Sequence, residues 1–533
     1  MPVAEKVNSI SVFLIRNDGF TKFGDLVVDD ITSDPIKIDD GELYYKTSGE
    51  DNYPPWVDRF FGTEKLGGNR EKLKTKTLSA VYFTQITVEE EKITFAVAFG
   101  NGRYLIKKGC IQHGFGLKTS RHAIDASRIN SVRTITYDSI IKDKTIRSIE
   151  DIRQSDFFLN ANTDVLTAVS GKVRTDKTGE LIRDRNIGGK DSVSISAYVD
   201  VRNLKEFLGQ LYEQYVSDGS EGVKYESNIR PLETKAEISF AEQLLQKLLE
   251  SYENEDTLFL NLPIENLGKK DKIISFTIED VEYEELTKDI FRKYSTVQKL
   301  KETTVHIHGE EDDEWNIENT LFNFVYAEFE HEKHFFVLAD GKFFSIVKGY
   351  KQSVETFYRN IKVETIADVT KWDGCSESDY NSSQKGESLL VLDEKFVFPE
   401  HRDRFEICDL LTHDKHIVHV KIFGGASQPL GHLFNQGMLS AQCMADDEIR
   451  PLIQDRIVSA QKSQGKSKDF SIESEFKPAD YTVTFMILCS DKTKIESDGR
   501  PKIPFLAKAV LKENYGIING LRFKVALACL EKS

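Results

Sequence analysis

An aspartate and a lysine lie on two short apolar segments that are separated by a polar turn. Asp409 belongs to the first segment, residues 405–411, and Lys421 belongs to the second, residues 416–423. This pattern predicts a β-hairpin that carries the two side chains on neighbouring strands. Carboxylates bind hard divalent cations, and a cation beside them can stabilise negative charge on a phosphate. The pair therefore favours metal-dependent phosphodiester hydrolysis.

Two further residues could take part in this chemistry. Glu377 lies upstream in residues 375–384, which we expect to be helical, and with Asp409 it could hold Mg²⁺ or Mn²⁺. His419 stands two residues before Lys421, so both side chains are expected on one face of the strand. Imidazole binds Mg²⁺ poorly, but it can bind Mn²⁺ or act as a general base. The catalytic residues predicted from the sequence are Asp409, Lys421, His419 and Glu377, with the metal held by Asp409 and Glu377.

A helix is predicted directly after the hairpin from its apolar periodicity. His432 and Gln436 are four residues apart, which places them on one polar face of that helix. The small residues 424–427 precede it, and their backbone amides could donate to a phosphate. We therefore expect His432, Gln436 and Ser427 to contact the substrate. The alternative is an ordinary polar helix face behind a flexible entry loop.

The hairpin resembles the restriction-nuclease-like core with the pattern PD-(D/E)XK. In that core an aspartate lies on one strand, an acid and a lysine stand two apart on the next, and a glutamate from an upstream helix often joins them. Asp409, Lys421 and Glu377 match these places. His419 occupies the position of the second acid, so the pattern also fits a catalytically inactive binding module.

Two other interpretations of the hairpin remain open. Asp409 could simply cap a turn, with Lys421 an ordinary surface lysine. A thiol nucleophile could also arise from Cys408 beside a histidine, although Cys408 lies within an apolar strand.

Motifs along the chain resemble a sporadically distributed bacterial family of unknown function. The motifs are EICDLL (406–411), VHVK (418–421) and LGHLFNQGMLSA (430–441), together with Arg450 and, more weakly, residues 502–511. The resemblance extends over most of the chain and identifies the histidine of the HVK motif as a family trait. Patchily distributed families are often defence proteins, so the resemblance implies an antiphage role that acts on DNA or RNA.

Composition predicts a soluble, cytoplasmic protein. The chain has 533 residues and a net charge of −16, which opposes non-specific attraction to nucleic acid and leaves room for a local basic groove. No apolar run approaches the ~18 residues of a membrane helix, and we expect no signal peptide. The six cysteines are widely spaced and lack a CxxC motif, so we expect free thiols. A partner protein or a second copy of the chain is a further expected partner.

Hydrophobic patterning predicts an α+β fold with three domains. Strand-rich α+β domains are expected over residues 1–216 and 229–370, and a break rich in Ser, Gly and charge separates them. Over residues 371–533 apolar strands and helices alternate, which favours a nuclease-like α/β domain.

The strand-rich run 322–347 contains an Asp-Gly pair that predicts a tight hairpin turn. His331 and His334 lie three residues apart in this run. We expect them to face opposite sides of a strand, which argues against a metal site there.

Overall fold

The computed structural model describes most of the chain. The described residues are 8–16, 20–29, 31, 34–47, 77–107, 109–137, 141–175, 179–217, 222–232, 234–251, 258–260, 273–276, 286–308, 317–332, 334–393, 395–399, 404–423, 427–473, 475–490 and 492–533. Both helices and strands are abundant among them, which confirms the predicted α+β class. In this part of the chain no helix is long and apolar enough to cross a membrane.

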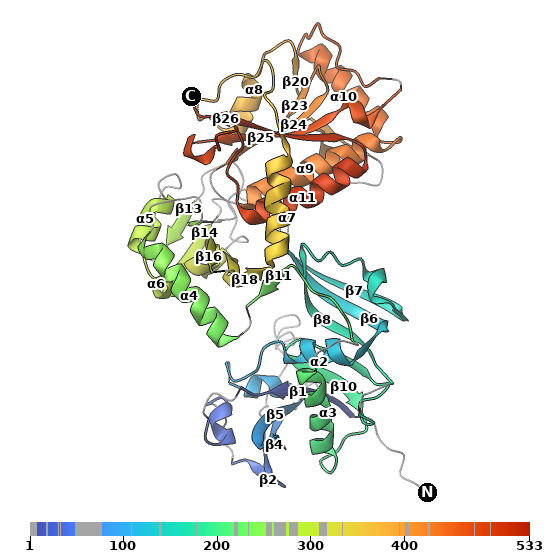
Figure 1. Ribbon diagram of the computed structural model, residues 1–533, viewed down its shortest axis with the longest axis vertical. Coiled ribbons are helices and arrows are strands. Elements are labelled where there is room, and N and C mark those ends of the chain that lie inside the picture. Colours follow the sequence, from blue (N-terminus) through green and yellow to red (C-terminus); the bar gives the residue numbers. More distant parts are fainter. Residues whose placement is uncertain are drawn as a thin grey trace, which may run out of the picture. The chain divides into compact units, whose positions relative to one another are not determined.

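The chain forms two compact units (Figure 1). The first contains residues 1–135, 143–160 and 165–226, and the second contains residues 136–142, 161–164 and 227–533. The division into three domains stays a prediction.

The first unit is built on a ten-stranded sheet with the order β2-β3-β4-β5-β1-β10-β9-β8-β6-β7. Strands β4 and β5 form an antiparallel hairpin within this sheet. Helix α3 forms where apolar residues recur at helical spacing, and its Phe207, Leu208 and Leu211 are buried. The strands and helices are β1 (Asn8–Leu14), β2 (Ile36–Ile38), β3 (Gly41–Thr47), β4 (Leu78–Val88), β5 (Glu91–Phe99), α2 (Phe115–Ala123), β6 (Ile124–Tyr137), β7 (Ile141–Ile152), β8 (Asp164–Val173), β9 (Asn186–Gly189), β10 (Ser192–Ala197) and α3 (Leu204–Val216).

The second unit begins with two smaller sheets. One has the strand order β11-β18-β17-β16-β12 and the other the order β13-β14-β15. Helix α4 starts at a capping box in which Thr234 and Glu237 satisfy each other's backbone N–H groups. The elements are β11 (Ile229–Pro231), α4 (Lys235–Glu250), β12 (Leu258–Leu260), β13 (Ile273–Phe276), α5 (Leu286–Lys293), α6 (Val297–Glu302), β14 (Thr304–His308), β15 (Ile317–Thr320), β16 (Val325–His331), β17 (His334–Ala339) and β18 (Lys342–Ile346).

The predicted Asp-Gly turn is confirmed between β17 and β18. Asp340 and Gly341 have φ values of 48° and 67°, the left-handed conformation that a two-residue hairpin turn needs. The placement predicted for His331 and His334 is wrong, because they lie on two strands instead of one. They pair directly across the β16–β17 hairpin, and such pairs share a face of the sheet.

The C-terminal part of the second unit holds a six-stranded sheet with the order β19-β26-β25-β24-β23-β20 (Figure 1, yellow to red). β24, β25 and β26 are parallel, whereas β23 runs antiparallel to both β24 and β20. The elements are α7 (Lys348–Asn360), β19 (Lys362–Val363), α8 (Glu377–Ser383), β20 (Leu389–Val391), β21 (Phe396–Val397), β22 (Phe405–Glu406), β23 (Leu410–Thr412), β24 (His416–Phe423), α9 (Ser427–Ala445), α10 (Arg450–Ser463), β25 (Thr482–Cys489), α11 (Phe505–Gly520) and β26 (Lys524–Glu531).

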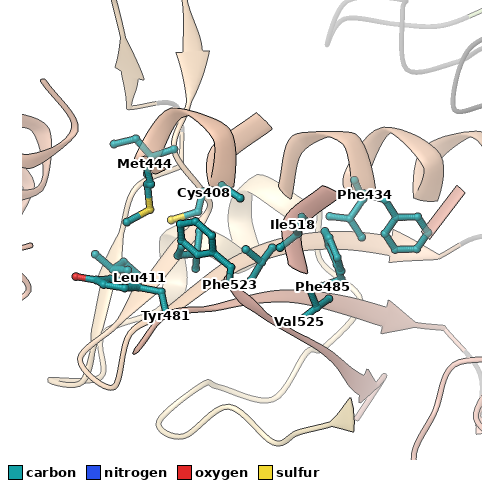
Figure 2. Packing of buried hydrophobic residues seen from close by; sticks show 14 of the residues in the cluster. Cys408, Leu411, Phe434, Met444, Tyr481, Phe485, Ile518, Phe523 and Val525 are labelled. Carbon is teal, nitrogen blue, oxygen red and sulfur yellow. The ribbon is translucent and has the colours of Figure 1, made fainter. Parts of the chain in front are cut away.

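Apolar side chains cover both faces of this sheet. Every residue of β25 is buried, as expected for a parallel strand with helices or loops on each side. On one face Phe485 packs against Phe434 of α9, within the core drawn in Figure 2. On the other face Tyr380 of α8 packs with Val418 and Val420. The sheet is therefore a rigid support for side chains at the ends of its strands.

Candidate functional site

The predicted hairpin over residues 405–423 is present as β23 and β24. Leu410 pairs with Val418 and Leu411 with Ile417 in antiparallel register. Asp409 immediately precedes β23, and its backbone N–H donates to the carbonyl oxygen of Val418 at 3.0 Å. The two apolar segments thus place the aspartate beside the middle of β24.

The carboxylate of Asp409 is held by two neighbours. Its Oδ2 accepts a hydrogen bond from the backbone N–H of Val420 at 2.7 Å, and its Oδ1 accepts one from Asn381 Nδ2 at 3.2 Å. The residue is only 8% exposed. Burial raises the pKa of Asp409 well above its usual value, and the charges of Glu406, Glu377 and Asp393 raise this pKa further. A cation bound nearby would lower the pKa of Asp409 again.

Three carboxylates converge at this point. Asp393, Glu406 and Asp409 each offer an oxygen, and these oxygens lie within 4.8 Å of one another. The strand pairing explains the cluster: β20 is antiparallel to β23, so Asp393, just beyond β20, lies near the start of β23. Leu392, next to it, donates its backbone N–H to the carbonyl oxygen of Asp409 at 2.8 Å. Three hard oxygen donors at this separation are suited to a divalent cation.

Lys421 and Glu377 form an ion pair. Glu377 starts α8, whose N-terminus is capped by Ser376. Oε2 of Glu377 lies 3.4 Å from Nζ of Lys421. The same oxygen accepts a hydrogen bond from the backbone N–H of Ile422 at 3.4 Å. The structure thus brings Glu377 to the lysine, whereas the prediction had paired it with Asp409 as a metal ligand. Its charge still reaches Asp409, whose pKa it raises.

Asn381 is buried beside the carboxylates and is only half satisfied. Its side chain is fully buried, and Nδ2 donates to Asp409. Its Oδ1 has no hydrogen-bond partner among the described residues. An unpaired buried polar atom costs about 1–3 kcal/mol. A water molecule or a cation bound at Oδ1 would remove that cost.

His419 faces the hydrophobic core. Its side chain is 2% exposed and its ring centroid lies 6.4 Å from that of Phe485. Burial lowers the pKa of His419 to about 3, so the imidazole is neutral near pH 7. A general base needs a pKa near the working pH, so the structure argues against that role. A role as metal ligand stays a prediction.

The predicted helix after the hairpin is α9. His432 is exposed and Gln436 half-buried, one turn apart on this helix. A Cβ at Gly437 would lie 2.4 Å from Cε1 of Phe485, so the glycine of the predicted motif lets α9 pack closely on β25. The backbone of residues 424–426 and the side chain of Ser427 lie outside the described residues. The substrate contacts predicted for His432, Gln436 and Ser427 stay predictions.

The thiol alternative receives no support. Cys408 is fully buried in the core, and burial raises the pKa of its thiol well above the usual value. A nucleophilic cysteine needs the opposite shift.

Sequence reasoning did not identify Asp393, and it gave no role to Asn381, the last residue of an E-x-x-Y-N pattern at 377–381 that weakly supports the family resemblance. Asp393 follows the apolar run that becomes β20, and only its pairing with β23 brings it to the hairpin. Asn381 lies one helical turn after Glu377, a spacing that could have pointed to it. Glu406, by contrast, could be recognised in the sequence as a second nearby acid.

Comparisons with known proteins give a family and nothing narrower. The model of a "Family of unknown function (DUF6119)" matches residues 10–531. This agrees with the predicted resemblance over most of the chain. No curated protein and no solved structure matches.

Proposed function

The chain belongs to DUF6119, a family of unknown function, and we propose that its C-terminal part is a metal-dependent nuclease that hydrolyses DNA or RNA. The observation that carries this proposal is the convergence of Asp393, Glu406 and Asp409 at the hairpin that also bears Lys421. Carboxylates that bind a divalent ion and a lysine near the scissile phosphate are the two requirements of this chemistry.

The three carboxylates would hold Mg²⁺ or Mn²⁺. Such an ion supplies a more acidic bound water and neutralises charge on the phosphate. Asp409 is the central ligand in this proposal because Val420 and Asn381 fix both of its oxygens. Its buried position makes the bare carboxylate unfavourable, so cation binding would relieve an existing electrostatic cost.

Glu406 supplies the second acid in this arrangement. In the restriction-nuclease-like pattern that acid stands two residues before the lysine, where this chain has His419. Glu406 lies three residues before Asp409 instead, and its oxygen is within 4.8 Å of the other two carboxylates. In this proposal Glu406 replaces the acid that is absent at position 419, so three carboxylates remain as metal ligands.

Lys421 would neutralise charge that develops on the phosphate, or orient the attacking water. Glu377 would position the lysine through the 3.4 Å contact between its Oε2 and the lysine Nζ. A hairpin bearing an aspartate and a lysine, joined by a glutamate from an upstream helix, resembles part of a restriction-nuclease-like core. His432 and Gln436, on a partly exposed face of α9, are proposed to contact the nucleic acid.

A nuclease assay tests the proposal. The full chain is incubated with single- and double-stranded DNA and RNA in Mg²⁺ or Mn²⁺, with a chelator as control. Cleavage should require the ion and should be lost in Lys421→Ala. Lys415→Ala is the matched control, because Lys415 lies in the turn of the same hairpin and pairs with Glu473 at 2.6 Å. Equal activity of the two variants would refute the proposed role of Lys421.

The alternative function is a nucleic-acid-binding or protein-interaction module without catalysis. The buried His419 at the position of an acid is the observation that favours it. Binding that weakens with salt, without cleavage under any metal condition, would support this alternative.

A role in bacterial defence is a further part of the proposal, and it rests on the predicted family resemblance. Cells that express the chain should survive phage challenge better than cells that express Asp409→Asn. Equal survival would remove the defence role without affecting the nuclease assay.

A further inference from the structure

Two cysteines lie side by side at the ends of the parallel strands β25 and β26. Sγ of Cys489 is 3.3 Å from Sγ of Cys529. Cys489 pairs with Glu531 in the strand register, two residues beyond Cys529, so the two cysteine side chains share a face of the sheet. The remaining cysteines of the chain are also free thiols.

We propose that Cys489 and Cys529 are a redox modification site, at which a peroxide converts the two thiols into a disulfide. This inference does not depend on the proposed nuclease activity. A disulfide needs an S–S distance of about 2.05 Å, so the sulfur atoms must approach by roughly 1.2 Å. Cys489 is the last residue of β25, and Cys529 lies two residues before the end of β26.

The surroundings favour a reactive thiolate. The hydrogen bond from the Cys529 thiol lowers the pKa of Cys489, burial opposes this shift, and the charge of Lys494 supports it. The hydrogen bond with Cys489 correspondingly raises the pKa of Cys529, so the pair tends to share one proton. Cys529 is partly exposed, whereas Cys489 is buried, so a small oxidant is expected to arrive from the side of Cys529.

The chemistry balances with hydrogen peroxide as the oxidant. The Cys489 thiolate attacks one peroxide oxygen, the O–O bond breaks, and hydroxide leaves and takes up a proton. The Cys529 thiol then loses its proton and attacks the sulfur of the resulting sulfenic acid, and the S–O bond breaks as water leaves. Two thiols and one peroxide thus give one disulfide and two waters, and a dithiol reductant reverses the change.

Peptide mapping tests the proposal on the full chain. The reduced protein is treated with hydrogen peroxide, alkylated, digested without reduction and analysed by mass spectrometry. We expect a linked pair of peptides that contain Cys489 and Cys529, loss of two of the six thiols, and recovery of both thiols with dithiothreitol. A wild-type protein that keeps all six thiols, or links a different pair, would overturn the proposal.

Two variants sharpen the test. Cys529→Ser should prevent the link and leave a sulfenic acid on Cys489 that a 1,3-diketone reagent labels. Cys375→Ser, at another partly exposed cysteine, should form the link as the wild type does. Circular dichroism on each variant confirms folding, and a link that persists in Cys529→Ser would contradict the assignment.

Discussion

Nζ of Lys421 lies 3.4 Å from Oε2 of Glu377, and this contact joins β24, the second strand of the hairpin, to helix α8. The two residues are 44 positions apart in the sequence and meet because α8 packs over β24. The glutamate also accepts the backbone N–H of Ile422. Through this contact the carboxylate holds the lysine on the hairpin that bears Asp409.

Glu377→Gln should lower the rate of the chemical step more than substrate binding. The substitution keeps the size of the side chain and removes the charge that positions Lys421. We expect kcat to fall about ten- to hundredfold with little change in KM. Steady-state kinetics with Mn²⁺ measure both constants. Glu387→Gln is the control, because Glu387 is exposed and accepts a hydrogen bond from Ser467. A pure KM effect would show that Glu377 contacts substrate instead.

Asp409→Asn should stabilise the metal-free protein while removing its response to metal. The pKa of Asp409 is raised in the folded state, so the folded chain binds this proton more tightly than the unfolded chain does. The contribution of Asp409 to the free energy of unfolding is therefore largest below about pH 4. It is lost as the pH rises from there through the pKa of Asp409 in the folded state. At pH 8 with a chelator, asparagine should raise the melting temperature by about 1–4 °C.

Added Mn²⁺ distinguishes this effect from simple repacking. Wild-type protein should melt at a higher temperature with Mn²⁺, and Asp409→Asn should show no such shift. Asp414→Asn, in the exposed turn of the same hairpin, should behave as the wild type does. A variant less stable than the wild type in chelator would contradict the electrostatic argument.

His419 should make the protein sensitive to acid. The pKa of His419 is lowered to about 3 in the folded state, so the unfolded chain takes up the proton first. The contribution of neutral His419 to the free energy of unfolding is complete above about pH 6.5. It is lost as the pH falls from that value towards 3. The loss by pH 5 is on the order of 2 kcal/mol.

Denaturant unfolding at several pH values measures this loss. His419→Leu should flatten the decline between pH 6.5 and 5, whereas His432→Leu should keep it, because His432 is exposed on α9. A decline that is identical in both variants would assign the acid sensitivity to other groups.

The N-terminus of α11 should depend on Glu328, a half-buried residue of the five-stranded sheet that contains β16. Glu328 of β16 accepts hydrogen bonds from the backbone N–H of Phe505 and, at 2.6 Å, from Tyr326 OH. Burial raises the pKa of Glu328. Glu328→Ala removes the carboxylate and leaves these two donors without an acceptor. The free energy of unfolding should therefore fall by about 2–4 kcal/mol.

Urea unfolding measures that cost. Glu330→Ala is the matched control, since Glu330 is a more exposed residue of the same strand. A Glu328→Ala variant as stable as this control would mean that α11 does not need the glutamate.

Local rules predicted much of the fold. The Asp340–Gly341 turn follows from residues that adopt positive φ at low cost, and β25 follows from a segment of mostly apolar and β-branched residues. The placement of His331 and His334 was wrong because the turn between them carries no such signal: Glu332 takes the left-handed conformation without glycine.

The candidate site was harder to predict because it depends on pairing between distant segments. Asp409 and Lys421 share one hairpin, so their relationship is local. Asp393 joins them only through the pairing of β20 with β23, and Glu377 only through the packing of α8. The burial of His419 likewise depends on Phe485, which lies 66 positions further along the chain.

The rate of phosphodiester cleavage by Asp409→Asn, relative to wild type, tests the central claim most directly. End-labelled DNA and RNA are incubated with each protein in Mn²⁺, and single-turnover rates are compared. We predict metal-dependent cleavage by the wild type and by Asp414→Asn, and a rate at least about a thousandfold lower in Asp409→Asn. Absence of cleavage by the wild type, or equal rates with and without the Asp409 carboxylate, would contradict it.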